Sequence, residues 1–306
     1  MSREFFYFPG WTRKAMSFTI DDGNIPLDTK FLNIVKPAGI IGTFNLCLPK
    51  PNMTPEKYRE LYRGYGIANH CAHHPLAFDP SKTYPELSDE KFDIEKSDTN
   101  YLYKSDIEGM YYYRYTANYW SVVATNDTYL KLIDECQVAL EEIFGKDGVD
   151  GFVWPYGKQR NPELLERIKA DGKYTSVRRT VCSTFDLPKD RFDWSYCAHH
   201  ENMTERAAEF EALEDDGELK WFCFGVHSHD FENNNCWDVL ENFAEKYGNR
   251  PEDFWYASVR DIFDYEDAVN AATVTDTEIV NNSEKTLYIV VNGKRVTLFP
   301  HAIYKF

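Results

Sequence analysis

The chain has 306 residues, of which 43 % are hydrophobic, and this is enough for one large α/β domain with a sizeable core. Its 34 basic and 50 acidic residues give a formal net charge of −16, which argues against nucleic acid or an anionic membrane surface as a partner. Aromatic residues make up 16 % of the chain, a share that fits a cleft lined by rings as well as a core packed with them.

Targeting and membrane signals are missing from the sequence as given. No stretch approaches 18 apolar residues, and the start, "MSREFFYFPGWTRKAMSF", lacks the layout of a secretory signal. The seven cysteines are scattered and form no C-x-x-C pair, which suits a reducing compartment and argues against a zinc ribbon. We therefore expect a soluble, cytoplasmic protein, and leave open whether it forms a homo-oligomer.

The first 75 residues alternate between strand and helix patterns. The apolar run "AMSFTI" (15–20) predicts a buried strand that ends in the polar turn "DDGN". Next come a helix, a second strand, a helix capped by Thr54 and a short third strand, in "LDTKFLNIVKPAG", "IIGTFNLCL", "TPEKYRELYRGYG" and "IAN". This alternation is typical of βαβ units and a parallel sheet.

The same alternation resumes after residue 128. It predicts helices in "YLKLIDECQVALEEIFG" and "NPELLERIKADG", and strands in "GFVWPYG", "YTSVRRT" and "LKWFCFGV". A Tyr-rich insertion separates the two halves at 77–128, and a strong hairpin signal, "NG" at 292–293, follows later. We expect one α/β domain over 1–268, interrupted by this insertion, and a small antiparallel β appendage over 269–306.

Chemically active side chains follow the predicted strands. In parallel α/β folds, ligands bind where strands end and loops begin. Those positions hold carboxylates, imidazoles and aromatic rings: Asp21 and Asp22, His70 and His74, Trp154 and Tyr156, and His227 and His229. The sequence therefore predicts a site at one rim of the sheet, rich in acidic and imidazole groups.

The first histidine cluster suggests a metal site. His70 and His74 have the i, i+4 spacing that aims two rings at one point from a turn of helix, and Asp22 would complete a three-ligand site. His73 is an alternative partner of His70 at i, i+3. Surface or capping histidines would also explain the spacing, but a double aspartate one βαβ unit upstream favours the metal.

Two adjacent aspartates at a strand end repel each other, which a cation or a division of roles would relieve. We expect Asp22 to coordinate the ion and Asp21 to accept a proton from water; an Asp-Asp-Gly turn is the simpler alternative. His227 is the candidate proton donor. Three further histidines, His229, His199 and His200, are weaker candidates with a loop role as default, and His301 lies in the predicted hairpin.

At this point a family resemblance becomes visible. The stretches "SFTIDDG", "GIANHCAHH", "FVWPYG", "FDW" and "FGVHSHD" resemble, in this order, the successive motifs of the polysaccharide deacetylases, carbohydrate esterase family 4. The resemblance covers residues 15–265 and implies a distorted (β/α) barrel with one divalent metal, usually zinc, at its mouth. It also implies that Asp21 is the catalytic base, that Asp22, His70 and His74 hold the metal, and that His227 is the general acid.

The resemblance also implies three residues of the substrate groove. Tyr156 would bind the oxyanion through its backbone N–H, Trp154 stands in the stretch that forms one wall of the groove, and Trp194 would cover the acetyl methyl group. The sequence departs from the family pattern at two positions. Val153 stands where the family has an arginine that orients the base, so Arg178 or Arg179 would have to replace it, and we place Arg179 among the substrate-binding residues. Cys71 replaces a serine or threonine.

These observations predict a metal-dependent hydrolase that removes acetyl groups from an N- or O-acetylated carbohydrate, with zinc as the expected ion. One alternative is hydrolysis of a non-peptide C–N bond, such as a cyclic amide, on the same barrel. Another is a metal- or carbohydrate-binding protein with weak catalysis. The expected partner is a carbohydrate substrate, with no nucleic acid and no membrane.

Overall fold

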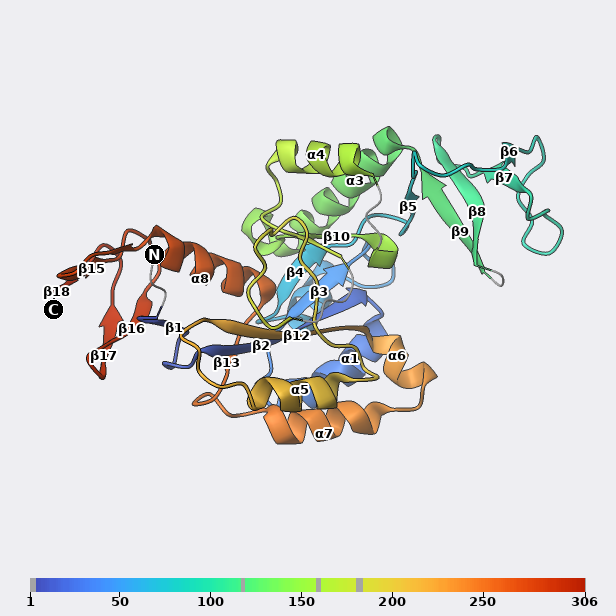
Figure 1. Ribbon diagram of the computed structural model, residues 1–306. Helices are drawn as coiled ribbons and strands as arrows, with labels where there is room; N and C mark the ends of the chain where they lie inside the picture. Colours follow the sequence, from blue (N-terminus) through green and yellow to red (C-terminus); the bar gives the residue numbers. More distant parts are fainter. Residues whose placement is uncertain (1–3, 117–118, 158–160, 180–183, 306) are drawn as a thin grey trace.

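A parallel sheet forms the centre of the molecule (Figure 1). The structure, a computed structural model, describes residues 4–116, 119–157, 161–179 and 184–305. Six parallel strands lie side by side in the order β11-β10-β4-β3-β2-β12, and β13 pairs with the start of β2. Their bounds are β2 Lys14–Asp22, β3 Thr43–Leu46, β4 Gly66–Asn69, β10 Phe152–Val153, β11 Val177–Arg178, β12 Lys220–His227 and β13 Trp255–Tyr256.

The two ends of this row of strands are linked to each other. An isolated parallel bridge joins Arg178 of β11 to Trp194, and a second one joins Ala198 to Phe224 of β12. Residues 194–198 therefore occupy the place of a further strand between β11 and β12, and we call this segment the seam. The predicted α/β fold, a mostly parallel sheet with helices, is confirmed, and at the seam isolated bridges take the place of a full strand.

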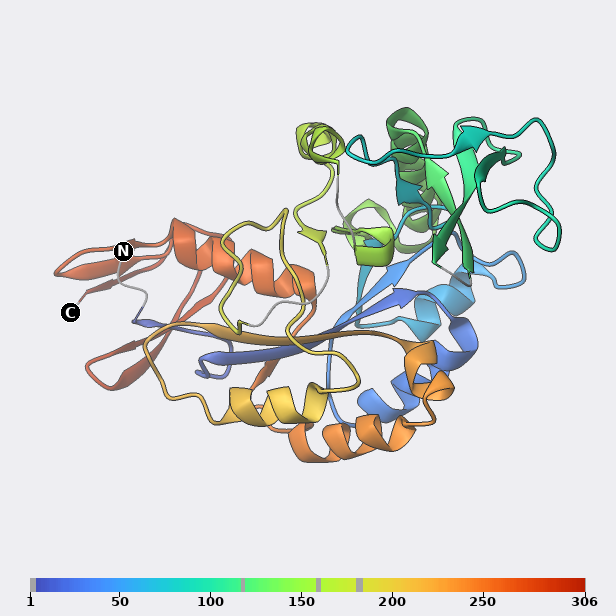
Figure 2. The same ribbon diagram turned by 45° about the vertical axis from the view of Figure 1, so that its right-hand side comes forward.

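Eight helices surround the sheet in the described part of the chain, and their ends follow sequence signals. Thr54 and Asn161 each accept a hydrogen bond from the backbone of the following turn, as expected of helix caps, and a proline occupies the first turn after each. Figures 1 and 2 show α3 and α4 on one side of the sheet and α1, α5 and α7 on the other. The helices are α1 Ile25–Val35, α2 Pro55–Leu61, α3 Asn126–Phe144, α4 Pro162–Asp171, α5 Met203–Glu211, α6 Ser228–Asn233, α7 Trp237–Tyr247 and α8 Val259–Ala271.

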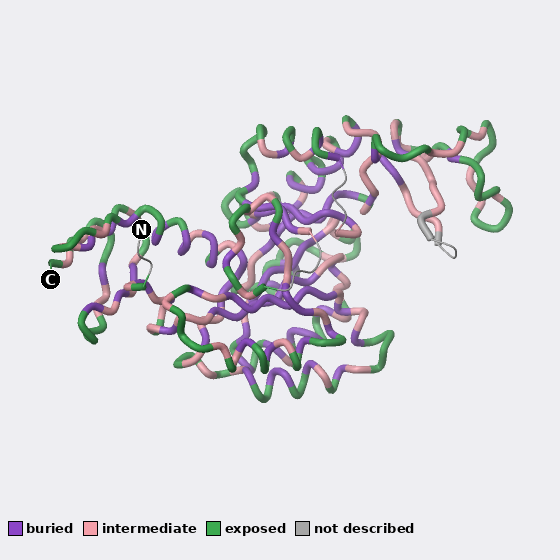
Figure 3. Tube along the Cα trace, in the orientation of Figure 1, coloured by how far each residue is buried: buried purple, intermediate pink, exposed green. Residues whose placement is uncertain are grey.

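Aromatic rings fill much of the core. Phe18 of β2 packs edge-on against Phe31 and Phe44, with ring centroids 5.0 and 5.4 Å away, and also contacts Phe224 of β12. All four side chains are buried, and Figure 3 shows the buried positions concentrated along the sheet and the inner faces of the helices. Core packing therefore uses many of the aromatic residues that the composition alone could also assign to a cleft.

The insertion forms a sheet of its own at one end of the molecule (Figure 1). Its strands pair in the order β5-β9-β8-β7-β6, and its outer loops are largely exposed. The strands are β5 Leu76–Ala77, β6 Glu86–Leu87, β7 Tyr101–Lys104, β8 Met110–Thr116 and β9 Tyr119–Ala124. The sequence pattern located this segment without indicating that it is a sheet.

The C-terminal strands lie at the opposite end (Figure 1). Asn292 and Gly293 have positive φ (51° and 77°) and join β16 to β17 in a two-residue hairpin turn, so the hairpin prediction is confirmed. Strand β1, Phe6–Tyr7, pairs with β16, which the pattern did not indicate. The strands of this end are β14 Thr273–Val274, β15 Glu278–Val280, β16 Leu287–Val291, β17 Lys294–Leu298 and β18 Ile303–Lys305.

The division into a 1–268 domain and a 269–306 appendage stays a proposal. Among the described residues, no helix combines the length and the apolar character needed to cross a bilayer.

Candidate active site

Strand register brings the predicted site residues to one rim. Asp21 of β2 lies directly opposite His227 of β12, and Asp22 lies opposite Leu46 of β3. Leu46 is in turn opposite Asn69, the last residue of β4. Because these strands are parallel, their carboxyl ends meet, and the polar residues that follow them are neighbours in space although they are distant in sequence.

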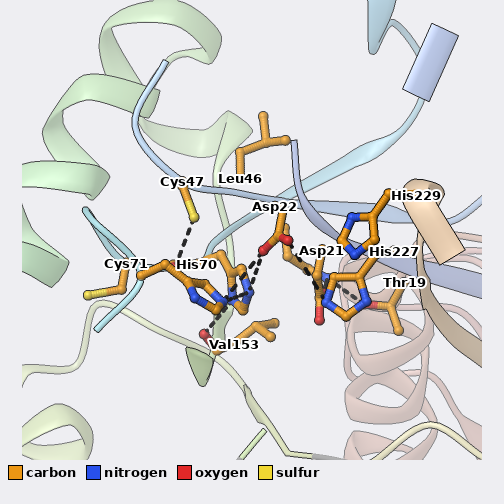
Figure 4. Close-up of polar contacts among 12 residues, drawn as sticks. Thr19, Asp21, Asp22, Leu46, Cys47, His70, Cys71, Val153, His227 and His229 are labelled. Atoms are coloured by element: carbon orange, nitrogen blue, oxygen red, sulfur yellow. Dashed lines mark hydrogen bonds and ion pairs between the residues drawn. The ribbon is translucent and has the colours of Figure 1, made fainter. Parts of the chain in front are cut away.

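Asp22, His70 and His74 converge on one point. The Nε2 atoms of His70 and His74 each lie 3.5 Å from Oδ1 of Asp22 and 3.1 Å from each other. Ligands about 2.1 Å from a tetrahedral ion are about 3.4 Å apart, so this spacing fits the edges of such a coordination shell. Figure 4 shows Asp22 between His70 on one side and His227 on the other. The donor set, one carboxylate and two imidazoles, suits zinc and related divalent ions.

The segment that carries the two histidines is a turn, not the helix expected from their spacing. Cys71, His73 and His74 all have positive φ (63°, 59° and 49°), which excludes a right-handed helix there. The side chain of Asn69 stabilises the turn, since its Oδ1 accepts a hydrogen bond of 2.8 Å from the backbone N–H of Cys71. The i, i+4 argument therefore reached the observed pair for a wrong reason. His73 is exposed and is not part of the group.

Both histidines present a nitrogen suited to a metal. Nδ1 of His70 lies 2.9 Å from the carbonyl oxygen of Val153; because that oxygen only accepts, Nδ1 carries the proton and Nε2 is left with its lone pair. Burial and the neighbouring His70 lower the pKa of His74 to about 4, so His74 is neutral near pH 7. Neutral imidazoles are the form that binds metal ions.

Asp22 also closes the turn that ends β2. Asp22 and Gly23 both have positive φ (78° and 69°), so the Asp-Asp-Gly turn and the candidate site are one feature rather than alternatives. Burial would raise the pKa of Asp22, but its contact with His70 and the nearby His74 and His227 hold that pKa well below its ordinary range. The carboxylate is therefore ionised and available to a cation.

Asp21 is held by an arginine from another strand. Nη2 of Arg178 lies 2.5 Å from both carboxylate oxygens of Asp21, and Nδ2 of Asn45 donates to Oδ1 at 2.7 Å. Burial would raise the pKa of Asp21, but the charge of Arg178 beside it holds that pKa below its ordinary value. Sequence reasoning missed Asn45, which lies opposite Asp21 on β3.

Arg178, rather than Arg179, makes up for the missing arginine. Arg178 is the register partner of Val153, so its guanidinium starts from the strand next to the one on which the family pattern places an arginine. It is 1 % exposed, whereas Nη1 of Arg179 pairs with the exposed Asp193. Successive side chains of a strand point to opposite faces, so only one of the two arginines faces Asp21. The geometry assigns the place of the missing arginine to Arg178, and substrate binding by Arg179 stays a prediction.

His227 stands on the other flank of Asp22. Its Nε2 lies 4.0 Å from Oδ2 of Asp22, and its Nδ1 lies 3.1 Å from Oδ2 of Asp230. Burial alone would lower the pKa of His227, but the hydrogen bond with Asp230 and the charges of Asp21 and Asp22 raise it to about 9. His227 is therefore protonated near pH 7 and able to donate a proton. Asp230 was missed, although it stands in the same "HSHD" stretch.

The two tryptophans predicted to line the groove lie elsewhere. Trp154 is 1 % exposed and packs against Phe152 and Tyr129 in the core. Trp194 is 3 % exposed and contacts Trp221, near the start of β12 and far along the strand from His227. The predicted groove roles of Trp154 and Trp194 are therefore corrected. An aromatic side chain in a motif can pack into the core as readily as it can line a groove.

Two tyrosines do stand near the site. The ring of Tyr156 packs on that of His74, with centroids 4.6 Å apart, and the backbone of Tyr156 has a positive φ of 62° in a 3₁₀ turn, Pro155–Gly157. The oxyanion role of its backbone N–H stays a prediction. Tyr196, on the seam, lies beside the guanidinium of Arg178, whose central carbon is 5.1 Å from the ring centroid. No sequence motif had marked Tyr196.

An open cleft leads to Asp22 of the candidate metal site. It has a volume of about 1000 Å³, and its lining includes Asp22, His229, Met53, Lys50 and Lys57. A smaller hollow of about 440 Å³ adjoins it, with Asp22 and Lys50 in both linings, and reaches His74. The site is thus accessible to a ligand of the size of a sugar unit or larger.

The comparisons with known proteins define the class of protein. The family described as "Polysaccharide deacetylase" matches residues 11–177, more than half of the chain. This protein therefore belongs to the polysaccharide deacetylase family. No curated protein sequence matches the chain.

Solved structures of the same class resemble its fold. A Mycobacterium smegmatis protein assigned to the polysaccharide deacetylases is 14 % identical, with a TM-score of 0.53 over 89 % of this chain and 96 % of that one. The peptidoglycan deacetylase PdaC of Bacillus subtilis is 16 % identical, with a TM-score of 0.45 over 84 % and 94 %. The Xyl-CE4 domain of a multidomain xylanase from the hindgut metagenome of Trinervitermes trinervoides is 15 % identical, with a TM-score of 0.48 over 83 % and 92 %.

Proposed function

We propose that this protein is a metal-dependent hydrolase that removes acetyl groups from an N- or O-acetylated carbohydrate. The observation that carries the proposal is the convergence of Asp22, His70 and His74, with Asp21 on one side and His227 on the other. Membership of the polysaccharide deacetylase family supports the substrate class. Zinc is the proposed ion, because two neutral imidazoles and a carboxylate are a common zinc ligand set.

The three ligands leave room for water and substrate. A divalent cation held by them supplies Lewis acidity, which polarises a carbonyl oxygen and lowers the pKa of water. Asp21 is ionised and is oriented by Arg178 and Asn45, so it accepts the proton of the attacking water. Arg178 engages both oxygens of the Asp21 carboxylate, whereas Asp22 would hold the cation, so the two adjacent aspartates would have separate roles.

The proton needed by the leaving group comes from the opposite flank. His227 is protonated near pH 7 and is oriented by Asp230, and its Nε2 faces the same rim as Asp22. It donates to the departing nitrogen of an amide or oxygen of an ester. Acetate and a free amino or hydroxyl sugar are the products.

The alternative reaction is hydrolysis of a cyclic amide on the same barrel. The absence of the motif arginine at Val153 would favour it, but Arg178 lies beside Asp21 and weakens that reason. Acetate release from N-acetylated chito-oligosaccharides and from acetylated xylan, compared with ring opening of small cyclic amides, separates the two reactions. Carbohydrate binding without either product would favour the binding protein.

Metal analysis of purified protein tests the ligand assignment. Asp22→Ala and His74→Ala should each contain one divalent ion fewer per chain than the parent, and acetate release should fall to background. His73→Ala is the matched control, since His73 is exposed beside the same turn, and it should keep both the ion and the activity. Unchanged metal content in Asp22→Ala and His74→Ala would refute the proposal.

A further inference from the structure

A second cluster of imidazoles and a carboxylate lies behind His227. One ring nitrogen of His199, one of His200 and a carboxylate oxygen of Asp230 all lie within 4.8 Å of one another. The rings of His199 and His200 are 4.4 Å apart, and Nε2 of His199 is 3.4 Å from Oδ2 of Asp230. We call this group the second cluster and the group of Asp22, His70 and His74 the first cluster.

Histidines are unusually concentrated around these two places. The chain has eight, and among the described residues six of them fall into groups able to hold an ion. The proposed reaction needs His70, His74 and His227 only. His199 and His200 therefore have no part in the proposed reaction. They come from a different segment, just before α5. Even so, they lie beside Asp230, the carboxylate that orients His227.

His200 provides an independent observation. Its side chain is 8 % exposed, and its Nδ1 is buried without a hydrogen-bond partner in the described part of the chain. A buried polar nitrogen left unpaired costs free energy, and such groups in folded proteins usually have a partner. An ion within the second cluster would explain why two adjacent imidazoles, one of them buried, are kept beside a carboxylate.

We propose that His199, His200 and Asp230 bind a second divalent cation, a transition-metal ion of the kind that prefers imidazole and carboxylate ligands. The 3.4 Å between His199 and Asp230 matches the edge of about 3.4 Å expected between two ligands of a tetrahedral zinc ion. A third polar side chain, His200, completes a set of the same composition as the first cluster. Solvent would fill the remaining positions.

The neighbouring pair His227 and His229 is a poorer choice for this ion. Both also lie near Asp230, but the ring of His227 is already engaged, with Nδ1 on Asp230 and Nε2 towards Asp22. His229 is partly exposed, and its Nε2 is 3.9 Å from Oδ1 of Asp230. Binding there would withdraw the proposed proton donor, so His199 and His200 are the assigned ligands.

The position of the second cluster gives the ion a consequence. Oδ2 of Asp230 accepts hydrogen bonds from the backbone N–H and from Nδ1 of His227, at 2.7 and 3.1 Å. A cation on the same carboxylate competes with these contacts. Metal binding at the second cluster would thus affect His227, the proposed general acid. This effect rests on the proposed function, whereas metal binding at the second cluster does not.

Zinc stoichiometry of the full-length protein tests the proposal. After dialysis against zinc-buffered solution, the parent should hold about two ions per chain, and His199→Ala and His200→Asn about one each, because each ligand lost weakens binding sharply. His199 is the safer change, since it is partly exposed; His200→Asn keeps a polar group in the buried position. His73→Ala should keep about two ions, as it touches neither cluster.

The first cluster serves as the internal control. Asp22→Ala should lose one ion and keep the other, and the double variant Asp22→Ala/His199→Ala should hold none. A parent with a single ion, or His199→Ala and His200→Asn with the parent's stoichiometry, would overturn the second site while leaving the proposed function intact. Loss of both ions from His199→Ala would also overturn it, because the clusters would then not be separate sites.

Discussion

The two clusters have the same ligand types but differ in how these ligands are held. In the first cluster, Nδ1 of His70 is fixed by the carbonyl oxygen of Val153, which leaves Nε2 directed at Asp22. In the second cluster, Asp230 also serves His227, so an ion there shares its carboxylate with a catalytic partner. We therefore expect the first cluster to bind zinc more tightly than the second. The types of ligand alone do not determine which of two sites has the higher zinc affinity.

The largest effect is expected from a change of Asp21, which lies beside the first cluster but is not one of its proposed ligands. Asp21→Asn should lower kcat by a factor of about 10² to 10⁴, as loss of a general base does, while both ions remain. Acetate release and metal analysis on the same sample check this. Loss of one ion from Asp21→Asn would instead make Asp21 a ligand and break the assignment of roles.

A smaller effect is expected from the group that orients Asp21. The charge of Arg178 lowers the pKa of Asp21, so its removal in Arg178→Gln raises that pKa and moves the acidic limb of the pH profile of kcat/KM to higher pH. The rate at neutral pH should fall by about 10- to 100-fold, the range typical of residues that orient others at metal sites. Arg179→Gln is the matched control and should leave the acidic limb in place.

The corresponding change at the second cluster acts on the alkaline limb. Asp230 raises the pKa of His227, whose value is about 9, so Asp230→Asn lowers it. His227 then loses its proton at lower pH, and activity should decline at lower pH than in the parent. Measured without added zinc, so that the second cluster of the parent is empty, His199→Ala keeps the hydrogen bond between Asp230 and His227 and should keep the alkaline limb of the parent. A shift in His199→Ala as well would show that Asp230 does not act on the pKa of His227 independently of His199.

The mildest test uses zinc itself. Excess zinc should fill the second cluster of the parent, compete for Asp230 and reduce acetate release by up to about tenfold, a magnitude typical of a disturbed orienting contact. His199→Ala should resist this inhibition at the same zinc concentrations. Equal inhibition of the parent and His199→Ala would show that zinc does not inhibit through the second cluster, and would contradict the proposed effect on His227.

Strand ends and helix boundaries were predictable because they depend on local signals. The run before Asp21 and the proline and asparagine at the start of α4 are read directly from neighbouring residues. The meeting of Asp22 with His70 was also within reach, because parallel strands end at a common edge. These predictions needed only the order of strand and helix patterns.

Side-chain direction was not predictable in the same way. Whether Arg178 or Arg179 faces Asp21 depends on the phase of a two-residue strand, which is too short to show alternation. Trp154 and Trp194 are buried against rings that are distant in sequence, Tyr129 and Trp221 respectively. The left-handed turn at Cys71, His73 and His74 is stabilised by a hydrogen bond that the side chain of Asn69 accepts from the backbone N–H of Cys71, and spacing alone did not reveal it.

The seam has a consequence for motion. Two isolated bridges join residues 194–198 to their neighbours, whereas β2 and β12 share eight paired positions. Local unfolding costs the least free energy where the fewest strand pairs hold a segment. Amide hydrogens along the seam should therefore exchange with solvent faster than those of β12. Tyr196 lies on the seam beside Arg178, and His199 follows the seam directly. Local opening of the seam would therefore disturb both the second cluster and Arg178, which orients Asp21, the proposed base.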